Sequence, residues 1–287
     1  MKVVTRQKPV VFTVANAKRA VVRAKDAVLD GHISMSAAGV AYFATLSFFP
    51  LVAALVAIAG LTLAPHQVQD IVQGVTALLP KDIASLITAQ LEHATDHQQT
   101  NVIIFWAALA LSLFGVSGAI ENTIKAINIT YHLEDTRSFV HQKVMSIGFT
   151  CLLIVGMAMV FPLVFVGPGL MAQWGVPGVV IDGFAVGRWL LLVAVALIGL
   201  GVLYHYAPNV KERSWRWISW GSLIATVLWL AVTAAFFVYL QYFANFSNSY
   251  SLFAGIIALM MWFNFSAIAV LVGASVNKEF EQNRQKK

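Results

Sequence analysis

Five long stretches of the chain contain no Asp, Glu, Lys or Arg. They are residues 31–69, 97–120, 144–181, 189–210 and 217–277. A helix needs about 20 apolar residues to cross a hydrocarbon core about 30 Å thick, and a bilayer offers no water to an exposed backbone. Several stretches are apolar on every side. This pattern favours membrane spans over the alternative, core helices buried in a soluble protein.

The last stretch, of 61 residues, is too long for one crossing, and the polar residues 245–250 interrupt it. We divide it into two spans joined by a short turn. The six predicted spans are residues 36–63, 102–120, 144–167, 189–206, 217–243 and 251–276. The predicted fold class is therefore all-α, a polytopic membrane protein with six transmembrane helices.

Two segments outside the spans also show helical patterns. Residues 14–29 repeat apolar positions at helical spacing among basic residues, which predicts an amphipathic helix along the inner leaflet or packed on the protein's own loops. The outer loop, residues 64–101, has two apolar stripes separated by Pro80, which predicts two short helices. They form either a lid over a cavity or simple loop packing. The predicted organisation is a basic tail (1–32), one membrane domain (33–277) and a second tail (278–287).

Composition and charge narrow the picture further. Hydrophobic residues make up 59% of the chain and charged residues only 11%, against about 25% charged in soluble domains. A soluble enzyme and a disordered chain are therefore excluded. The net charge of +6 suggests nucleic-acid binding, but 17 of the 19 basic residues lie on one side of the predicted topology. The positive-inside rule then predicts cytoplasmic termini and contacts with anionic lipid, without nucleic acid.

The spans offer little catalytic chemistry. Glu121 and Asp182 lie at span edges, and the middle of each span lacks a charged residue. His93 and His97 have the spacing of two metal ligands on one helix face, but no third ligand follows at a recognisable spacing. The single cysteine, Cys151, is expected to be a packed small hydrophobe. The sequence thus predicts no catalytic residue, no cofactor and no metal site.

The polar and proline residues within the spans are the remaining candidates. Pro50 and Pro162 would break helical hydrogen bonding and free backbone carbonyls, either for function or for packing alone. Uncharged polar residues in the spans are expected to form hydrogen bonds between helices. These residues are Ser112, Ser117, Thr226, Thr233, Asn264 and Ser266.

Four segments together resemble the YihY/BrkB family of bacterial inner-membrane proteins. The first, residues 33–51, contains Tyr42 and the Phe49-Pro50 pair. The second segment is Ser117-Gly118 followed by residues 126–131. The third is residues 206–229, which contain Pro208 and Trp229, and the fourth is residues 262–277, which contain Gly273-Ala274 and Asn277. The family often has an acidic residue where this chain has Ser275, and a Tyr-Gly-Ser turn where it has Tyr250-Ser251-Leu252.

The resemblance implies six spans with cytoplasmic termini in a bacterial inner membrane, and a link to envelope and lipid functions. The leading hypothesis is transport or binding of a lipid or other amphiphile in support of envelope integrity. A scaffold that binds a partner membrane protein is the alternative. Members also carry the label ribonuclease BN, but this chain has no nuclease constellation. The expected partners are membrane lipids, with a second copy of the chain or another membrane protein as alternatives. The candidate transport or structural residues are Tyr42, Pro50, Asn128, Pro162, Pro208, Trp229, Asn264 and Asn277.

Overall fold

The computed structural model describes residues 31–62, 98–165, 171, 175–210, 219–243 and 251–285. This part of the chain is helical and contains no strand, which confirms the all-α fold class. Its long helices are α2 (His32–Thr62), α5 (Gln98–Tyr131), α6 (Phe139–Phe165), α8 (Gly178–Tyr206), α9 (Trp220–Phe243) and α10 (Ser251–Gln285). These six helices are long and apolar enough to cross a membrane, as predicted. The expected helix at 14–29 and almost all of the outer loop lie outside the described residues.

Three helices extend well beyond the spans that the charge pattern predicts. Helix α5 continues past residue 120 to Tyr131, α8 begins at Gly178 instead of 189, and α10 continues past residue 276 to Gln285. Helix α5 has 34 residues, which corresponds to about 51 Å at 1.5 Å per residue, against a core of about 30 Å. Hydropathy marks the part of a helix that meets lipid, whereas backbone hydrogen bonding continues through polar residues.

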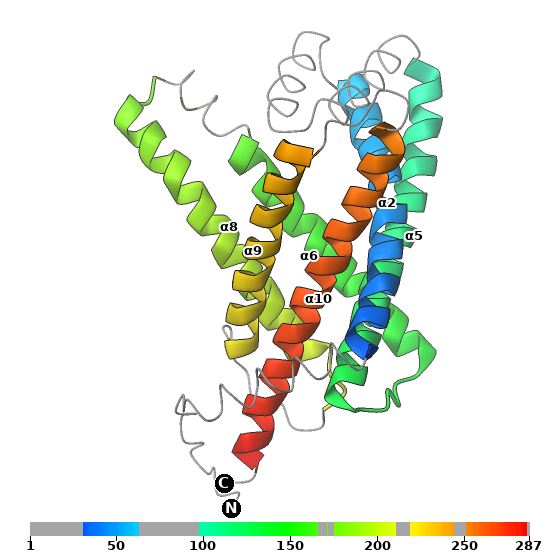
Figure 1. Cartoon of the computed structure of the whole chain (residues 1–287). Coiled ribbons are helices and arrows are strands. Elements are labelled where there is room, and N and C mark those ends of the chain that lie inside the picture. The colour runs from blue at the N-terminus through cyan, green and yellow to red at the C-terminus, as the bar shows by residue number, and fades with distance from the viewer. Residues whose placement is uncertain are drawn as a thin grey trace, which may run out of the picture.

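Helix α10 is the central element of the bundle (Figure 1). It contacts α2, α5, α8 and α9, and α2 packs along α5 more extensively than any other pair. The other substantial contacts are α5 with α6, α8 with α9, and a small contact between α6 and α8. All six helices are therefore joined, and the two smallest of these contacts, α8 with α10 and α6 with α8, both involve α8.

The buried core lies toward one end of the bundle. We call this the Asn128 end, because α5 finishes there just after Asn128, α8 finishes there, and α6 and α9 begin there. The core cluster draws on α2, α5, α8, α9 and α10, and many of its members are alanines, which let helices approach closely. Its buried residues are Ile33, Ala37, Ile124, Ala126, Ile127, Tyr131, Tyr204, Ala207, Ala225, Ala267, Leu271 and Ala274.

Glycines allow the closest helix crossings. A Cβ at Gly115 of α5 would lie 2.6 Å from Cβ and 2.9 Å from Cα of Ser47 in α2. A Cβ at Gly273 of α10 would lie 2.5 Å from the Cβ of Ala225 in α9, and 2.6 Å from the carbonyl oxygen of Gly221. In contrast, a Cβ at Gly148 of α6 would meet no atom within 4 Å. The α2–α5 and α9–α10 contacts thus require glycine, whereas α6 does not at this position.

This difference predicts opposite effects of the same substitution. Gly115→Ala should lower the free energy of unfolding by about 1–3 kcal/mol, because the new methyl group meets the backbone of Ser47. Gly148→Ala should leave stability unchanged or raise it by about 0.5–1 kcal/mol, because alanine is the better helix former. Denaturant unfolding of both variants in the same detergent micelles measures the difference. Equal midpoints would contradict the packing described for α2 and α5.

Candidate functional site

The end of α5 is the starting point of a polar network. His132 adopts a left-handed conformation with φ of 55°. The N–H of Leu133 donates to the carbonyl oxygen of Asn128 at 3.0 Å, and the N–H of His132 donates to that of Ile129 at 2.9 Å. This pair of bonds is the Schellman motif, which satisfies carbonyl groups that the end of a helix would leave unpaired. The chain therefore turns sharply after Tyr131 into the short α5–α6 loop.

The side chain of Asn128 joins α5 to the end of α8. Its amide nitrogen donates to the carbonyl oxygen of Ala207 at 3.3 Å and to that of Ile124 in its own helix at 3.1 Å. Pro208 stops α8, because proline has no N–H to continue the helix. The N–H of Asn209, which follows it, then donates to the Asn128 side-chain oxygen at 2.8 Å. One buried amide thus satisfies both a donor and an acceptor at the end of α8.

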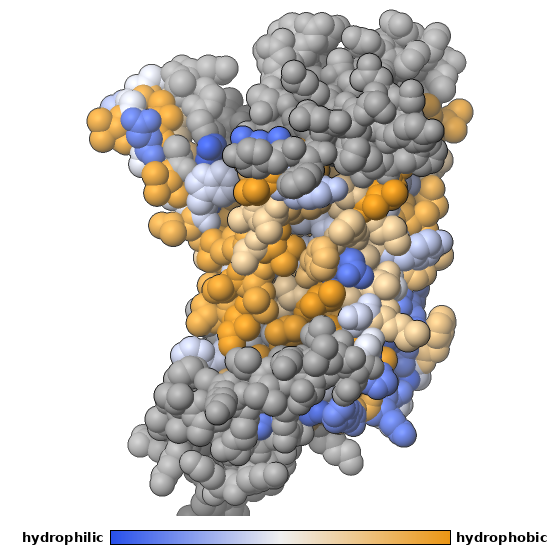
Figure 2. Space-filling model, in the orientation of Figure 1, coloured by the Kyte–Doolittle hydropathy of each residue, from blue (hydrophilic) through white to orange (hydrophobic). Residues whose placement is uncertain are grey.

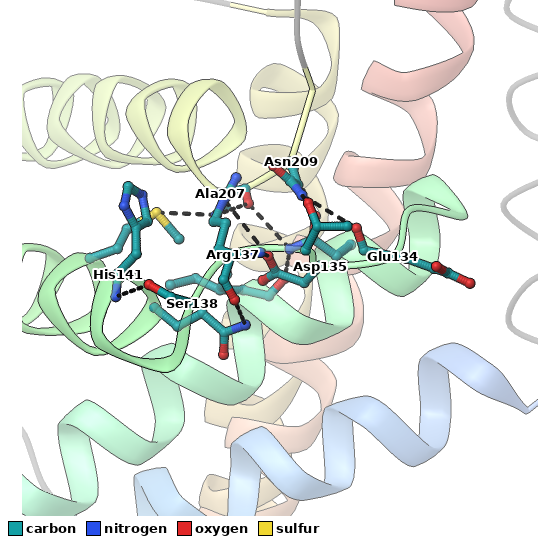
Figure 3. A network of polar contacts seen from close by, with 12 residues as sticks. Glu134, Asp135, Arg137, Ser138, His141, Ala207 and Asn209 are labelled. Atoms are coloured by element: carbon teal, nitrogen blue, oxygen red, sulfur yellow. Dashed lines mark hydrogen bonds and ion pairs between the residues drawn. The ribbon is translucent and has the colours of Figure 1, made fainter.

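The α5–α6 loop fastens to the same helix end (Figure 3). The guanidinium of Arg137 donates to the carbonyl oxygen of Ala207 at 3.1 Å, and its Nε lies 3.8 Å from Oδ1 of Asp135. A cation at this position also interacts favourably with the C-terminal end of the α8 dipole. The Asn209 side-chain amide donates to the Glu134 carbonyl oxygen at 3.3 Å and to the Thr136 hydroxyl at 3.1 Å. The α5–α6 loop and the end of α8 therefore form one unit.

Helix α10 completes the network. The amide of Asn277 donates to the hydroxyl of Tyr131 at 3.1 Å, and Nζ of Lys278 donates to the carbonyl oxygen of Thr130 at 3.0 Å. The hydroxyl of Tyr204 in α8 donates to the carbonyl oxygen of Val270 at 2.6 Å. We call these contacts, together with those of Asn128, Arg137 and Asn209, the Asn128 network. It joins α5, α8 and α10 at one end of the bundle.

Among the side chains that the structure describes, polar contacts also join α6 to α5 near the start of α6. The hydroxyl of Ser146 donates to the carbonyl oxygen of Ser117 at 2.8 Å, and the two serine hydroxyls lie 3.1 Å apart. Glu121 pairs with Lys125 in its own helix at 2.7 Å and with Lys143 of α6 at 3.6 Å. These contacts hold the first turns of α6 against the second half of α5.

Above these contacts α6 separates from α5 (Figure 1). Residues 151–155 of α6 are all exposed. Five consecutive helical residues cover every side of a helix, so no described element buries this segment. The stripe of α5 that continues from Ser117 away from the Asn128 end is exposed as well, with Phe114 61% and Trp106 63% exposed. We call residues 151–155 of α6 and this stripe, formed by Ile103, Trp106, Ala110 and Phe114, the uncovered α5–α6 faces.

Helix α8 shows a similar change along its length. Its last turn is buried at Tyr204. Toward Gly178 it leans away from α9 (Figure 1), and large apolar side chains there are exposed, including those of Val179, Trp189 and Leu190. The bundle is thus tightly joined at the Asn128 end and separates along α6 and α8 toward the other end. An apolar band of side chains covers the surface between the two ends (Figure 2).

The structure brings three of the eight predicted candidate residues together. Asn128 and Asn277 form the bonds described above, and Pro208 is fully buried beside them. Tyr42 is exposed on α2, and Pro50 lies within α2, which continues through it to Thr62. Helix α6 likewise continues through Pro162. Trp229 and Asn264 are partly buried on α9 and α10, away from the network.

The expectation of hydrogen bonds between helices holds for some polar residues and fails for others. Ser117 bonds to Ser146 of α6, and Thr233 of α9 accepts a hydrogen bond from Nε1 of Trp262 at 3.3 Å. Ser112 and Thr226 instead donate to carbonyl oxygens of their own helices. Ser and Thr hydroxyls often bond in this way within apolar helices. Asn264 and Ser266 form no hydrogen bond with the described part of the chain, and the hydroxyl of Ser266 is buried.

Sequence reasoning missed the structural roles of Arg137 and Lys278. It used both residues only to orient the protein, with basic side chains meeting lipid. In the structure Arg137 is nearly buried against α8, and Lys278 is 8% exposed against α5. The nearby Asp135 was a weak signal for Arg137, because a short loop with both charges favours an ion pair.

The site has no recognisable reaction chemistry among the described residues. No group of three or more His, Cys, Asp or Glu residues there could hold a metal ion. Cys151, expected to be packed, is exposed on α6. The arrangement combines a fixed polar end with uncovered apolar faces.

The Asn128 network predicts a large effect of replacing its central amide. Asn128→Leu should lower the free energy of unfolding by about 1–3 kcal/mol, because it leaves the buried N–H of Asn209 without its partner. Asn122→Leu is the matched control on the same helix, since the Asn122 amide donates only to Gly118 of α5. Thermal unfolding of both variants in lipid nanodiscs tests this. A loss no larger than that of the control would contradict the role of Asn128.

Comparison with known proteins places these observations in a family. The chain matches the family described as virulence factor BrkB over residues 24–287. It is 28% identical to the putative ribonuclease-like protein YfkH of Bacillus subtilis over 244 residues, which cover 84% of this chain and 87% of that protein. It is 27% identical to a UPF0761 membrane protein of Pseudoalteromonas translucida over 263 residues, covering 86% and 81%. No solved structure matches it.

The family match covers all four segments that carry the resemblance, which include Asn128, Asn209 and Asn277 of the Asn128 network. A UPF0761 membrane protein of Verminephrobacter eiseniae is 25% identical over 251 residues, which cover 85% of this chain and 58% of that protein. It and the relative from Pseudoalteromonas translucida are both described as membrane proteins. These descriptions agree with the six apolar helices of the structure. The chain belongs to the BrkB virulence factor family and is an integral membrane protein.

Proposed function

We propose that the protein binds a membrane lipid, or a similar amphiphile, against the uncovered α5–α6 faces and moves it between leaflets, in support of envelope integrity. The exposure of residues 151–155 on every side of α6 is the observation that carries this proposal. A helix inside a bundle normally buries one side against its neighbours. Acyl chains are the apolar material that a bilayer supplies to cover such a segment.

The distribution of contacts supports a protein that changes shape at one end. The Asn128 network fixes the ends of α5 and α8 against α10, while the described polar contacts of α6 with α5 come from the first turns of α6. Helices α6 and α8 can therefore rock about the Asn128 end without breaking the core. Rocking of one group of helices against another is a common way for transporters to expose a site alternately to two sides.

The proposed location is a bacterial inner membrane, with the Asn128 end and both termini in the cytoplasm. Lys125, Arg137, Lys143 and Lys278 lie at this end, and basic residues are retained on the cytoplasmic side. Arg188 lies in the other half of α8. The polar network then faces the cytoplasm, and the separated parts of α6 and α8 face the opposite side.

We propose a role in binding and transport, not in catalysis. The name of the Bacillus relative suggests RNA cleavage, which requires a group of acidic or metal-binding residues. In this chain Glu121 pairs with Lys125 and Lys143, and Asp135 with Arg137. The Glu121–Lys143 pair joins α5 to α6, and the Asp135–Arg137 pair lies within the α5–α6 loop.

The proposed orientation predicts the result of reporter fusions. Green fluorescent protein fused after Lys287 should fluoresce, because it folds in the cytoplasm, whereas alkaline phosphatase fused there should be inactive. Alkaline phosphatase inserted in the outer loop at residues 64–101 should be active, because that loop would lie outside. The reverse pattern of activities would overturn the proposed orientation.

If lipid moves along the uncovered α5–α6 faces, a bulky residue placed there should slow its transfer. Leu153 is exposed on α6, one turn beyond Thr150 on the side that faces α5. Leu153→Trp should slow the transfer of a fluorescent phospholipid between leaflets of reconstituted vesicles by about tenfold, as an added barrier of ~1.4 kcal/mol does. A dithionite quenching assay measures the rate.

Phe237→Trp is the control, because Phe237 is exposed on α9, outside the uncovered α5–α6 faces. It should leave the transfer rate unchanged. Vesicles containing the unmodified protein that transfer lipid no faster than empty vesicles would contradict the proposed movement. If the protein also copurified with a stoichiometric partner protein and no lipid, the scaffold alternative would replace the lipid hypothesis.

A further inference from the structure

Asn264 lies at the middle of the membrane-spanning part of α10. It is equally far along the sequence from Ser251, where α10 begins, and from Asn277, which precedes the first charged residue of the helix. At 1.5 Å per residue each distance is about 20 Å. The hydrocarbon core is only about 30 Å thick, so Asn264 lies near its midplane, where neither water nor a lipid headgroup is available.

The amide of Asn264 has no hydrogen-bond partner within the described part of the chain. It is only partly buried, so one side of it faces the lipid. Leaving an amide without a hydrogen bond in an apolar medium costs about 2–7 kcal/mol, depending on the reference state. Other side-chain amides are paired in this protein, such as Asn128 with Ala207 and Asn277 with Tyr131. The amide of Asn264 is thus satisfied by no described residue, and a partner outside the chain can supply the missing bond.

The surface around Asn264 is an exposed stripe of α10. Ile257, Met260, Met261 and Phe265 are all exposed, and helical spacing places Asn264 among them. The buried residues of the same region, Ala258 and Ala267, lie at the two edges of this exposed stripe. The space-filling view shows a hydrophilic patch at mid-height within the apolar band over α10 (Figure 2). We call these four apolar residues and Asn264 the α10 stripe.

We propose that the α10 stripe binds a second copy of this chain, with the two Asn264 amides hydrogen bonded to each other across a two-fold axis. An amide carries both donors and an acceptor, so it is its own complement. Two copies inserted with the same topology place Asn264 at the same depth, and a two-fold interface brings identical residues together. The two methionines suit such a contact, because their flexible side chains fill irregular spaces.

Other occupants fit the stripe less well. Acyl chains have no hydrogen-bonding group, and headgroups lie about 15 Å from the midplane. A different membrane protein would need a polar side chain at the same depth, whereas a second copy supplies one by symmetry. The stripe is separate from the uncovered α5–α6 faces, so this association does not depend on lipid movement.

Self-association of the full-length chain in lipid vesicles tests the proposal. Energy transfer between donor- and acceptor-labelled copies, measured over a range of protein-to-lipid ratios, gives the dissociation constant. Asn264→Leu should weaken association by roughly 3- to 30-fold, the range that an interhelical hydrogen bond of about 0.6–2 kcal/mol produces. Ser266→Ala is the matched control, because Ser266 lies at nearly the same depth on the opposite side of α10, and it should associate as tightly as the unmodified protein.

Oxidative cross-linking in native membranes gives a second, independent readout. Met261→Cys combined with Cys151→Ser should form a disulfide-linked dimer, because Met261 lies one turn from Asn264 on the stripe. The unmodified chain, whose Cys151 is exposed on α6, should not. A monomer at every density, equal association of the Asn264→Leu variant, or cross-linking through Cys151 instead of position 261 would each overturn the proposal. A cross-linked product containing a different protein would also overturn it.

Discussion

A bilayer core offers no hydrogen-bonding partner, so a helix that ends or bends inside the protein must find one within the chain. In this protein one buried amide, that of Asn128, meets this requirement for the end of α8. It accepts a hydrogen bond from the N–H of Asn209 and donates to the carbonyl oxygen of Ala207. The α5–α6 loop joins the same carbonyl through Arg137. The tight end of the bundle depends on this set of bonds.

The same requirement explains why the two ends of the bundle differ. Polar contacts and close glycine or alanine crossings join the helices near Asn128, whereas residues 151–156 of α6 have neither. An apolar helix surface gains little from contact with another apolar helix when lipid tails are the alternative. Helices α6 and α8 are therefore free to separate where no polar contact holds them. This freedom is what makes a lipid-handling role reasonable for the uncovered faces.

Asn264 is the counterpart of Asn128 on the outer surface. Both are asparagines of long helices, Asn128 beyond the charge-free part of α5 and Asn264 in the middle of the charge-free part of α10. Asn128 finds its partners on α8, whereas Asn264 finds none within the described residues and faces the lipid. Asn128 stabilises the fold of a single chain, and Asn264 is suited to a contact between two chains. The difference comes from which side of its helix each residue occupies.

The sequence by itself determined the number of spans and the six-helix fold, because the cost of burying charge in hydrocarbon is a local property that composition reveals. It also placed Asn128, Pro208 and Asn277 among the candidates. Only the tertiary structure decided which of these residues meet. The hydrogen bond between Asn128 and Asn209 joins positions 81 residues apart, and the bond between Asn277 and Tyr131 joins positions 146 residues apart. It also decided that Arg137 and Lys278 are buried and that α6 is uncovered. Such outcomes depend on how helices pack, and hydropathy along the chain carries no information about which sides of two helices face each other.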